Sequence, residues 1–287
     1  NLSKDLREKL SEAFIINPIS VDLLQKSKDG TIKNGVKLHD GLMVESVLIP
    51  TESRTTACVS SQVGCSLNCE FCATAKLKRM RNLEVAEIVD QVALIDKQSK
   101  LYFDRPLSNI VFMGMGEPMM NYKNVVDAIK KITDEDGLGM SARRITVSTS
   151  GIPKMMRMLA DENLKVKLAL SLHSAIEHKR NEIMPFSTKF PLTEIMEAMQ
   201  YWYSKTENRI TFEYCVWKGI NDGDEDIKAL IKYCRQVPCK VNLIQYNPIG
   251  EGKFDHRSVE AEERYVRELE KAGITVLVRR SRGGDID

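Results

Sequence analysis

The stretch TTACVSSQVGCSLNCEFC, from Thr55 to Cys72, joins a short β-branched run to a loop that carries three cysteines. Their spacing is C-x3-C-x2-C, and no fourth ligand with zinc-like spacing follows nearby, whereas a structural zinc site usually has four ligands. An iron–sulfur cluster is ordinarily held by four cysteines, so three would leave one iron open to a substrate or cofactor. Three buried structural cysteines are the alternative, but a loop with glycine and asparagine is a poor place for core packing. The spacing therefore favours a metal cluster with an open position.

Six short β-branched runs alternate with helical patterns from Thr55 onward. The runs cover residues 55–60, 109–113, 144–148, 165–171, 209–216 and 240–245. The helices are expected near residues 85–98, 122–133, 153–159, 192–203, 225–236 and 258–272. Such alternation predicts a parallel sheet with right-handed crossovers that curl it toward a barrel. Because six units are fewer than the eight of a closed barrel, we predict an α/β fold, a partial and laterally open (βα)6 barrel. Active residues should lie on the loops after the strand ends.

The residues before this repeat show a different hydrophobic pattern. Apolar residues recur every four positions between Leu2 and Phe14, which predicts a helix over residues 1–16. The stretch 36–50 reads as a β-hairpin that turns at Asp40-Gly41. We therefore divide the chain into the end of an N-terminal helical accessory module (1–35), a β-hairpin extension (36–54) and the partial barrel (55–287).

Composition limits the class of protein. The 287 residues include 42 lysines and arginines against 40 aspartates and glutamates, so the formal net charge is +2. A hydrophobic share of 43% and a charged share of 29% argue against a disordered or collagen-like chain. No apolar run approaches the roughly 20 residues that cross a bilayer, so we expect no membrane association. Seven cysteines are too few for a disulfide framework and fit a reducing, cytoplasmic location.

Several segments beyond the cysteine loop carry a family resemblance. They are VFMGMGEPMMN (Val111 to Asn121), RRITVSTSG (Arg143 to Gly151), LALSLHSA (Leu168 to Ala175), RITFEYCV (Arg209 to Val216), VNLIQYNPI (Val241 to Ile249) and VRRSRGGDID (Val278 to Asp287). Together with CVSSQVGCSLNCEFCATA, they resemble the radical S-adenosylmethionine (SAM) adenine-C2 RNA methyltransferase family. The resemblance runs from about Val36 to Asp287. It implies an enzyme that methylates C2 of adenine in 23S ribosomal RNA and transfer RNA.

The resemblance also implies a set of cofactor ligands. Cys65, Cys69 and Cys72 would bind a [4Fe-4S] cluster, and SAM would occupy the open iron. Gly116 and Glu117 match the family's SAM-contacting pair, in which glycine allows close backbone approach and the carboxylate can hold the methionyl ammonium. Further SAM-binding positions are matched by Ser148, Ser171, Leu172, His173 and Asn247.

Two further residues match catalytic positions of the family. Cys58 would be a cysteine that resolves a protein–RNA cross-link, although a buried strand cysteine is the ordinary alternative. Glu45 would be the proton acceptor. In the family's scheme, one SAM methylates a cysteine near the C-terminus and a second SAM supplies a radical that activates this methyl group. That cysteine follows the motif RGGDID, so we expect the protein to continue beyond Asp287.

RNA is the expected partner, because one adenine must leave its stack and enter the barrel mouth. Phosphate-binding cations are expected beside the cysteine loop, at Lys76, Lys78, Arg79 and Arg81, with further candidates at Arg143, Arg144, Arg279, Arg280 and Arg282. We also expect a flavodoxin-type electron donor and a monomer. A sibling C8-adenine rRNA methyltransferase of antibiotic resistance is the alternative enzyme, and Pro118 after GMGE favours the C2 branch. The alternative outside enzymes is a zinc-stabilised RNA-binding module.

Overall fold

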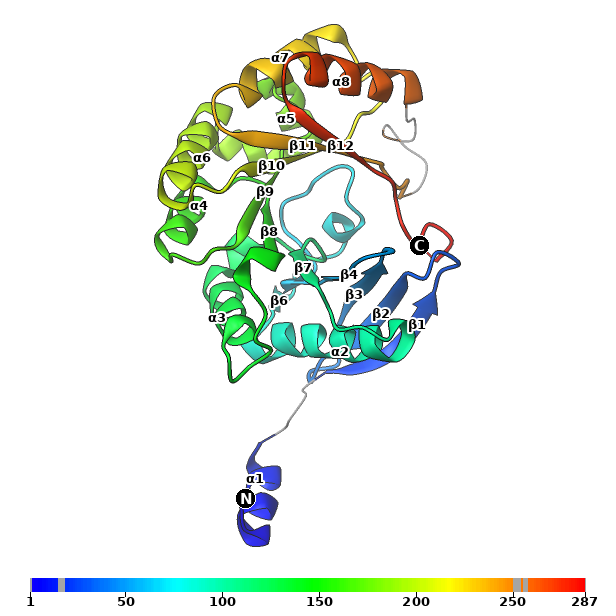
Figure 1. The fold of residues 1–287 in the computed structure, drawn as a ribbon, viewed down its shortest axis with the longest axis vertical. Helices are drawn as coiled ribbons and strands as arrows, with labels where there is room; N and C mark the ends of the chain where they lie inside the picture. Colours follow the sequence, from blue (N-terminus) through cyan, green and yellow to red (C-terminus); the bar gives the residue numbers. More distant parts are fainter. Residues whose placement is uncertain (1, 15–18, 250–253, 255–257, 287) are drawn as a thin grey trace.

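The fold is built around one curved sheet with helices on its outer side. The computed structural model describes residues 2–14, 19–249, 254 and 258–286. Its main sheet has ten strands in the order β1-β2-β3-β4-β7-β8-β9-β10-β11-β12. Figure 1 shows the sheet as an arc that surrounds a loop drawn in cyan. The strands are β1 (Ser20–Lys26), β2 (Ile32–Lys37), β3 (Met43–Pro50), β4 (Thr55–Cys58), β7 (Asn109–Phe112), β8 (Ile145–Thr149), β9 (Lys167–Ser171), β10 (Ile210–Tyr214), β11 (Cys239–Ile244) and β12 (Thr275–Arg279).

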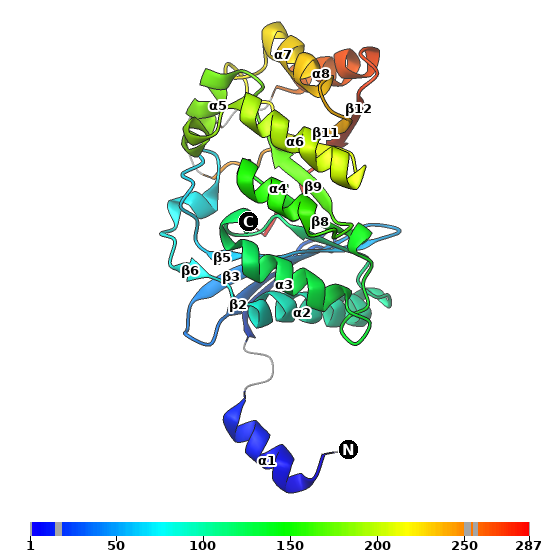
Figure 2. The ribbon, with the colours of Figure 1, turned by 90° about the vertical axis from the view of Figure 1, so that its left-hand side faces the viewer.

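The six βα units expected from the sequence are confirmed. Neighbours from β4 through β12 all pair in parallel. The main connecting helices are α2 (Val85–Phe103), α3 (Tyr122–Thr133), α4 (Pro153–Asp161), α6 (Leu192–Thr206), α7 (Asp224–Cys234) and α8 (Val259–Lys271). Figure 2 shows α2, α3, α4 and α6 stacked along one side of the sheet. The expected α/β partial barrel is therefore present.

Some short elements were not expected. A short helix, α5 (Glu177–Ile183), lies between β9 and α6, and β12 follows α8 as an additional parallel strand. Short 3-10 turns occur at η1 (Ala73–Lys76), η2 (Pro118–Asn121), η3 (Ala142–Arg144) and η4 (Pro185–Lys189). The burial pattern explains why β12 was missed, since none of its residues is buried.

Alternation along each strand gives the sheet two different faces. Ile110 and Phe112 of β7 are buried in the hydrophobic core, as is Val147 of β8. Thr146 and Ser148, on either side of Val147, point to the opposite, inner face, because successive side chains of a strand alternate between its two faces. The helices complete the core with residues at helical spacing, as α2 does with Ile88, Val92 and Ile95. Burying each such side chain contributes about 1.5–3 kcal/mol. The packing layer thus lies outside the arc, and the inner face keeps polar side chains.

The N-terminal region departs from the expectation. Helix α1 (Lys4–Ala13) is confirmed within the described part of the segment 1–16, and it buries none of its residues. Residues 20–35 were expected to belong to the helical module, and this was wrong, because β1 and β2 pair antiparallel with each other and β2 pairs with β3. The hairpin around Gly41 is confirmed as β2 and β3. Strand β1 was missed because its exposed edge position imposes no alternating hydrophobic pattern.

Side chains link the β1–β2 turn to the C-terminal segment that follows β12. Asp29, in the β1–β2 turn, accepts a hydrogen bond from the Gly283 N–H at 3.1 Å. The C-terminal segment returns the contact, since Asp285 accepts from the Lys28 N–H at 3.1 Å and from the Ser27 hydroxyl. Edge strands β1 and β12 are at opposite ends of the strand order, which makes the barrel laterally open as expected. Across the described residues, no helix combines the length and apolarity that crossing a membrane requires.

Candidate cluster and SAM site

The three cysteines lie on a loop, residues 64–80, that projects from a small two-stranded ladder. Strands β5 (Gln62–Val63) and β6 (Arg81–Asn82) form this ladder, which closes the base of the loop. The Gln62 side chain donates to Asn82 Oδ1 at 2.8 Å, and the Met80 N–H donates to the Val63 carbonyl at 2.9 Å. We call residues 64–80 the cluster loop. The ladder therefore fixes where the cluster loop leaves and rejoins the chain between β4 and α2.

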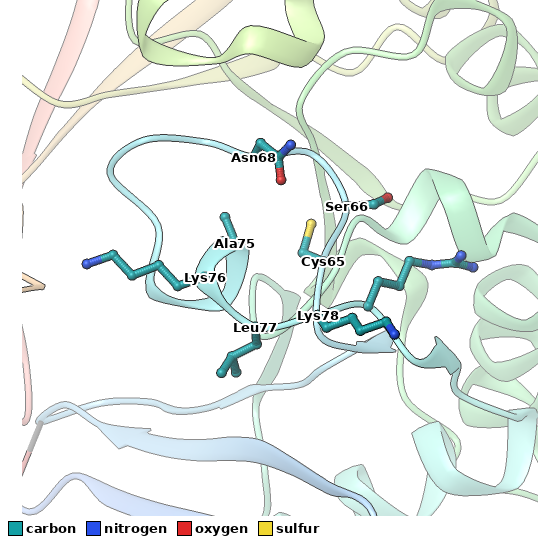
Figure 3. A pocket seen from close by; sticks show the side chains of 8 residues that line it. Cys65, Ser66, Asn68, Ala75, Lys76, Leu77 and Lys78 are labelled. Atoms are coloured by element: carbon teal, nitrogen blue, oxygen red, sulfur yellow. The ribbon is translucent and has the colours of Figure 1, made fainter.

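An open cavity lies inside this loop, and the first of the three cysteines lines it. The cavity has a volume of about 520 Å³ and is lined by Cys65, Ser66, Asn68, Ala75, Lys76, Leu77, Lys78 and Arg79. Figure 3 shows the Cys65 thiol directed toward the space that the loop encloses. Burial raises the pKa of the Cys65 and Cys69 thiols, and the neighbouring cysteines raise the pKa of Cys69 further. The three thiols thus lie near one another on one loop, and Cys65 lines its cavity.

The donor set fits a [4Fe-4S] cluster with one open iron. Three thiolates are suitable ligands for an iron–sulfur cluster. Burial alone disfavours the ionised form of these thiols, and ligation to iron would stabilise it. In the described part of the chain, no three His, Cys, Asp or Glu side chains already converge in metal-ligand geometry. The assignment of Cys65, Cys69 and Cys72 therefore rests on their chemistry and their common loop.

An aromatic contact seats the cluster loop on the barrel. The Phe71 ring, next to Cys72, meets the His173 ring at a centroid distance of 4.6 Å and the Trp217 ring at 5.3 Å. The Glu70 N–H donates to the carbonyl of Ile183, at the end of α5, at 3.1 Å. These contacts hold the middle of the loop against the ends of β9 and β10.

Gly116 and Glu117 lie beside the loop, at the carboxyl end of β7. Gly116 has φ +92°, and a Cβ there would come within 2.4 Å of the Gln62 Cβ, so only glycine fits. The Glu117 carboxylate is buried, and its two oxygens accept the N–H groups of Met119 at 3.0 Å and Ser150 at 2.8 Å. Burial raises the pKa of this carboxyl, while the Ser150 hydrogen bond acts in the opposite direction. A carboxylate has further lone pairs for a ligand ammonium.

The remaining SAM candidates lie at the ends of neighbouring strands. Ser148 is near the end of β8, and Ser171 ends β9. Leu172 is buried, and its N–H donates to the Glu213 carbonyl at 3.0 Å. Asn247 is exposed and follows β11. Because these strands are parallel, all these positions lie at the same end of the sheet as the cluster loop. Their contact with SAM stays a prediction.

His173 is committed to contacts within the protein. It is buried with φ +56°, and its Nδ1 accepts the Cys215 N–H at 3.2 Å, so the neutral ring carries its proton on Nε2. Burial lowers the pKa of the imidazole to about 3, and the charge of Arg180 acts in the same direction. His173 therefore stays neutral, its backbone N–H donates to the Glu213 carbonyl at 3.4 Å, and its carbonyl accepts the Asn221 side-chain amide at 2.7 Å.

Glu45 and Cys58 share the inner face of β3 and β4. Cys58 pairs with Val47, and Glu45 lies two residues before Val47, so both side chains point to the same side. Burial raises the pKa of the half-buried Cys58 thiol to about 12, opposed by a hydrogen bond with the Met113 backbone and aided by the charge of Glu45. The Glu45 side chain is 58% exposed, with its Oε1 3.8 Å from Lys33 Nζ. A thiol and a carboxylate thus face the lumen together.

The candidate phosphate-binding cations separate into two groups. Lys76, Lys78 and Arg79 line the cavity of the cluster loop. Arg81 does not belong with them, because both its Nη atoms donate to the Glu87 carboxylate at 2.8 Å and its Nε donates to Asp40 at 2.6 Å. Burial sets this difference, since the Glu87 side chain is fully buried and must be paired.

Sequence reasoning missed two residues at this end of the barrel. Ser150 is held from both sides, by Glu117 at its N–H and by Arg180 at its carbonyl. Arg180 stands in a charged run, HKRNE, and looks like a surface residue. Its spacing from Ile176 and Ile183, four residues after one and three before the other, is the signal that would have placed it on the buried face of α5.

Comparison with known proteins agrees with this geometry. A family model described as the Radical SAM superfamily matches residues 59–234. A crystal structure described as a radical SAM methyltransferase from Sphaerobacter thermophilus is 39% identical and superposes with a TM-score of 0.96, covering 99% of this chain and 84% of that one. The barrel and its thiol loop are therefore those of a radical SAM protein.

Curated relatives narrow the class. A "Probable dual-specificity RNA methyltransferase RlmN" of Flavobacterium psychrophilum is 65% identical over 100% of this chain and 83% of its own length. The protein of the same description from Christiangramia forsetii is 66% identical over 100% of this chain and 82% of its own length. The chain belongs to the dual-specificity RNA methyltransferase family of the radical SAM superfamily, whose members use a [4Fe-4S] cluster and SAM.

Proposed function

We propose that this protein is a radical-SAM methyltransferase that adds a methyl group to C2 of adenine in 23S rRNA and tRNA. One observation carries the proposal. The loop with three thiols and the polar ends of β7, β8 and β9 open at the same end of the barrel, in a chain that is similar over its whole length to dual-specificity RNA methyltransferases.

The chain's own residues define what the cofactors would meet. Cys65, Cys69 and Cys72 would hold the cluster, and the residues at the strand ends, from Gly116 and Glu117 to Asn247, would hold SAM. When bound, a [4Fe-4S] cluster with an open iron supplies the electron that cleaves SAM to a 5′-deoxyadenosyl radical. The buried environment of Glu117 and His173 favours a water-poor site in which such a reactive species is shielded.

Glu45 and Cys58 supply proton transfer and product release. Adenine C2 is an electron-poor carbon, so its methylation needs a radical route and then removal of the C2 proton, for which Glu45 is the base. Cys58 releases the product from a covalent protein–RNA adduct by attacking the sulfur of the methyl-carrying cysteine, so that a disulfide forms, the sulfur–carbon bond breaks and the released carbon takes up a proton. A thiol with a pKa of about 12 is protonated at neutral pH, so it needs a neighbouring base to become a nucleophile. Glu45 is the carboxylate on the same face.

RNA approaches from the side of the cluster loop. The target adenine must leave its stack to reach a site inside the barrel, and Lys76, Lys78 and Arg79 stand at the cavity beside it, where phosphates would pass. We further propose a monomer that receives electrons from a flavodoxin-type donor in the cytoplasm. Seven free cysteines suit that reducing compartment.

The test is to map adenine methylation in RNA from a strain that lacks the gene. Mass spectrometry of digested 23S rRNA and tRNA separates 2-methyladenosine from 8-methyladenosine by chromatography. We expect 2-methyladenosine to disappear from both RNAs and to return with the wild-type gene. A gene with Cys69→Ala should not restore it. Loss of 8-methyladenosine instead would identify the C8 sibling activity, and unchanged methylation would refute the proposal.

A further inference from the structure

Arg180, on α5, is a buried guanidinium that forms no ion pair with any residue that the structure describes. Its side chain is fully inaccessible to solvent. Its Nη2 donates to the carbonyls of Ser150 at 2.7 Å and Ser171 at 3.2 Å. Its Nε and Nη1 have no hydrogen-bond partner among the described residues. A buried charge usually has a counter-charge, because desolvation costs several kcal/mol per ion. Two carbonyl groups and two unused donors leave this cation uncompensated.

The charged groups around Arg180 do not balance it. Glu177, one turn earlier on α5, is exposed, and its carboxylate accepts the Leu192 N–H at 3.0 Å. Lys179 has its own partner, since its Nζ lies 2.9 Å from Asp226. His173 is neutral, as shown by the hydrogen bond that its Nδ1 accepts.

The nearest functional groups are those of the candidate cofactor site. Glu117 and Arg180 bind the two sides of Ser150, so Arg180 fixes the backbone that holds this carboxylate. Helix α5 also carries the cluster loop, through the bond from the Glu70 N–H to the Ile183 carbonyl at 3.1 Å. Cys69 packs against the hydrophobic cluster that contains Ile183, which lies three residues after Arg180 on α5.

We propose that Arg180 is a positioning residue that supplies the positive charge facing the cluster and fixes the ends of β8 and β9 where SAM is bound. The inference rests on the proposed function, because it assumes that the three thiols hold a [4Fe-4S] cluster. An oxidised cluster core with three thiolates carries a net charge of about −1, and its reduction adds one negative charge. Net charge and hydrogen bonding around a cluster set its reduction potential. A cation in a buried, weakly screened position therefore favours the reduced state.

The two roles of Arg180 can be separated by substitution. Arg180→Gln removes the charge and the fork of donors. Arg180→Lys keeps the charge, but an ammonium on a flexible stem lacks the planar fork that reaches two carbonyls at once. Arg157→Gln is the matched control. Arg157 on α4 is partly exposed and lies 3.5 Å from the Glu197 carboxylate, so solvent and a counter-charge already screen its charge. Arg180→Gln and Arg157→Gln thus make the same change in two electrostatic settings, and Arg180→Lys separates the charge from the fork of donors.

The experiment measures two properties of the anaerobically reconstituted protein, the midpoint potential of the cluster and the dissociation constant of SAM. Arg180→Gln should lower the equilibrium constant for cluster reduction at least about tenfold, equal to a shift of about 59 mV to more negative potential. Arg180→Lys should stay within about threefold of wild type in this constant. Both should weaken SAM binding by about tenfold, as expected when the polar ends of β8 and β9 lose their anchor. Arg157→Gln should match the wild type in both measurements.

Each outcome decides the question. An Arg180→Gln protein with full iron content, wild-type potential and wild-type SAM affinity overturns the inference. If Arg180→Gln takes up no cluster but Arg180→Lys does so at the wild-type potential, the requirement for charge is supported. If both variants lose the cluster and the apoproteins melt at a lower temperature than wild type, Arg180 is structural and the inference is overturned. A wild-type protein that binds no cluster overturns the proposed function itself, whereas unchanged potentials overturn only the role of Arg180.

Discussion

Replacing Gly64 by alanine should disturb the base of the cluster loop. Gly64 has φ +71°, and a Cβ built there would lie 2.3 Å from the Lys78 carbonyl oxygen and 2.7 Å from its carbon. Both are backbone atoms of the segment that leads back into β6, so no side-chain rotation relieves the contact. The two ends of the loop must move apart, and the cavity between them changes shape.

The size of the effect follows from two contributions. A residue with a side chain at positive φ costs about 1–2 kcal/mol, and a steric overlap that moves packed backbone costs about 1–3 kcal/mol. The free energy of unfolding should therefore fall by roughly 2–5 kcal/mol. For a chain of this size each kcal/mol lowers the melting temperature by about 2–4 °C, so we expect a decrease of about 4–20 °C.

Gly41→Ala is the control that separates these contributions. Gly41, in the β2–β3 turn, has φ +82°, and a Cβ there would meet nothing within 4 Å. It should therefore cost only the backbone contribution, about 1–2 kcal/mol. Thermal unfolding followed by circular dichroism, together with the iron content after reconstitution, is the assay. Gly64→Ala should melt lower than Gly41→Ala and take up less iron. Equal melting temperatures and iron contents in the two variants would refute the reasoning.

Two other predictions concern buried charge and the thiol at the lumen. Arg81→Ala should reduce the free energy of unfolding by about 3 kcal/mol in a urea titration, because it leaves the fully buried Glu87 carboxylate without its bidentate partner; a loss below about 1 kcal/mol would contradict this. Alkylation of Cys58 by iodoacetamide, followed by mass spectrometry of its peptide, should be about 10³-fold slower at pH 8 than that of an ordinary thiol with a pKa of 9, since its own pKa is about 12. The rate should rise about tenfold per pH unit up to pH 11; a plateau near pH 9 would show an unperturbed thiol.

The sequence by itself determined the repeating units and the chemistry of the loop. Continuous apolar strands and amphipathic helices are local patterns, and they specify buried parallel strands wherever they alternate. The spacing of Cys65, Cys69 and Cys72 is also local, so the thiol loop and its likeness to radical SAM proteins could be found without coordinates. The position of Gly116 and Glu117 after a strand followed from the same alternation.

Only the tertiary structure decided which charged side chains are paired or buried and which segments form the edge strands of the sheet. Arg81 looks like its neighbours Lys78 and Arg79, but its pairing with Glu87 and Asp40 depends on where α2 and the β2–β3 turn are packed. Arg180 is a charged residue that is nevertheless buried, because the face of α5 that carries it packs against the ends of β8 and β9. Edge strands β1 and β12 carry no alternating pattern, since neither buries a residue, and only their hydrogen-bonded neighbours make them strands. The burial of a side chain and the pairing of a strand both depend on residues from several segments, so no single stretch of sequence specifies them.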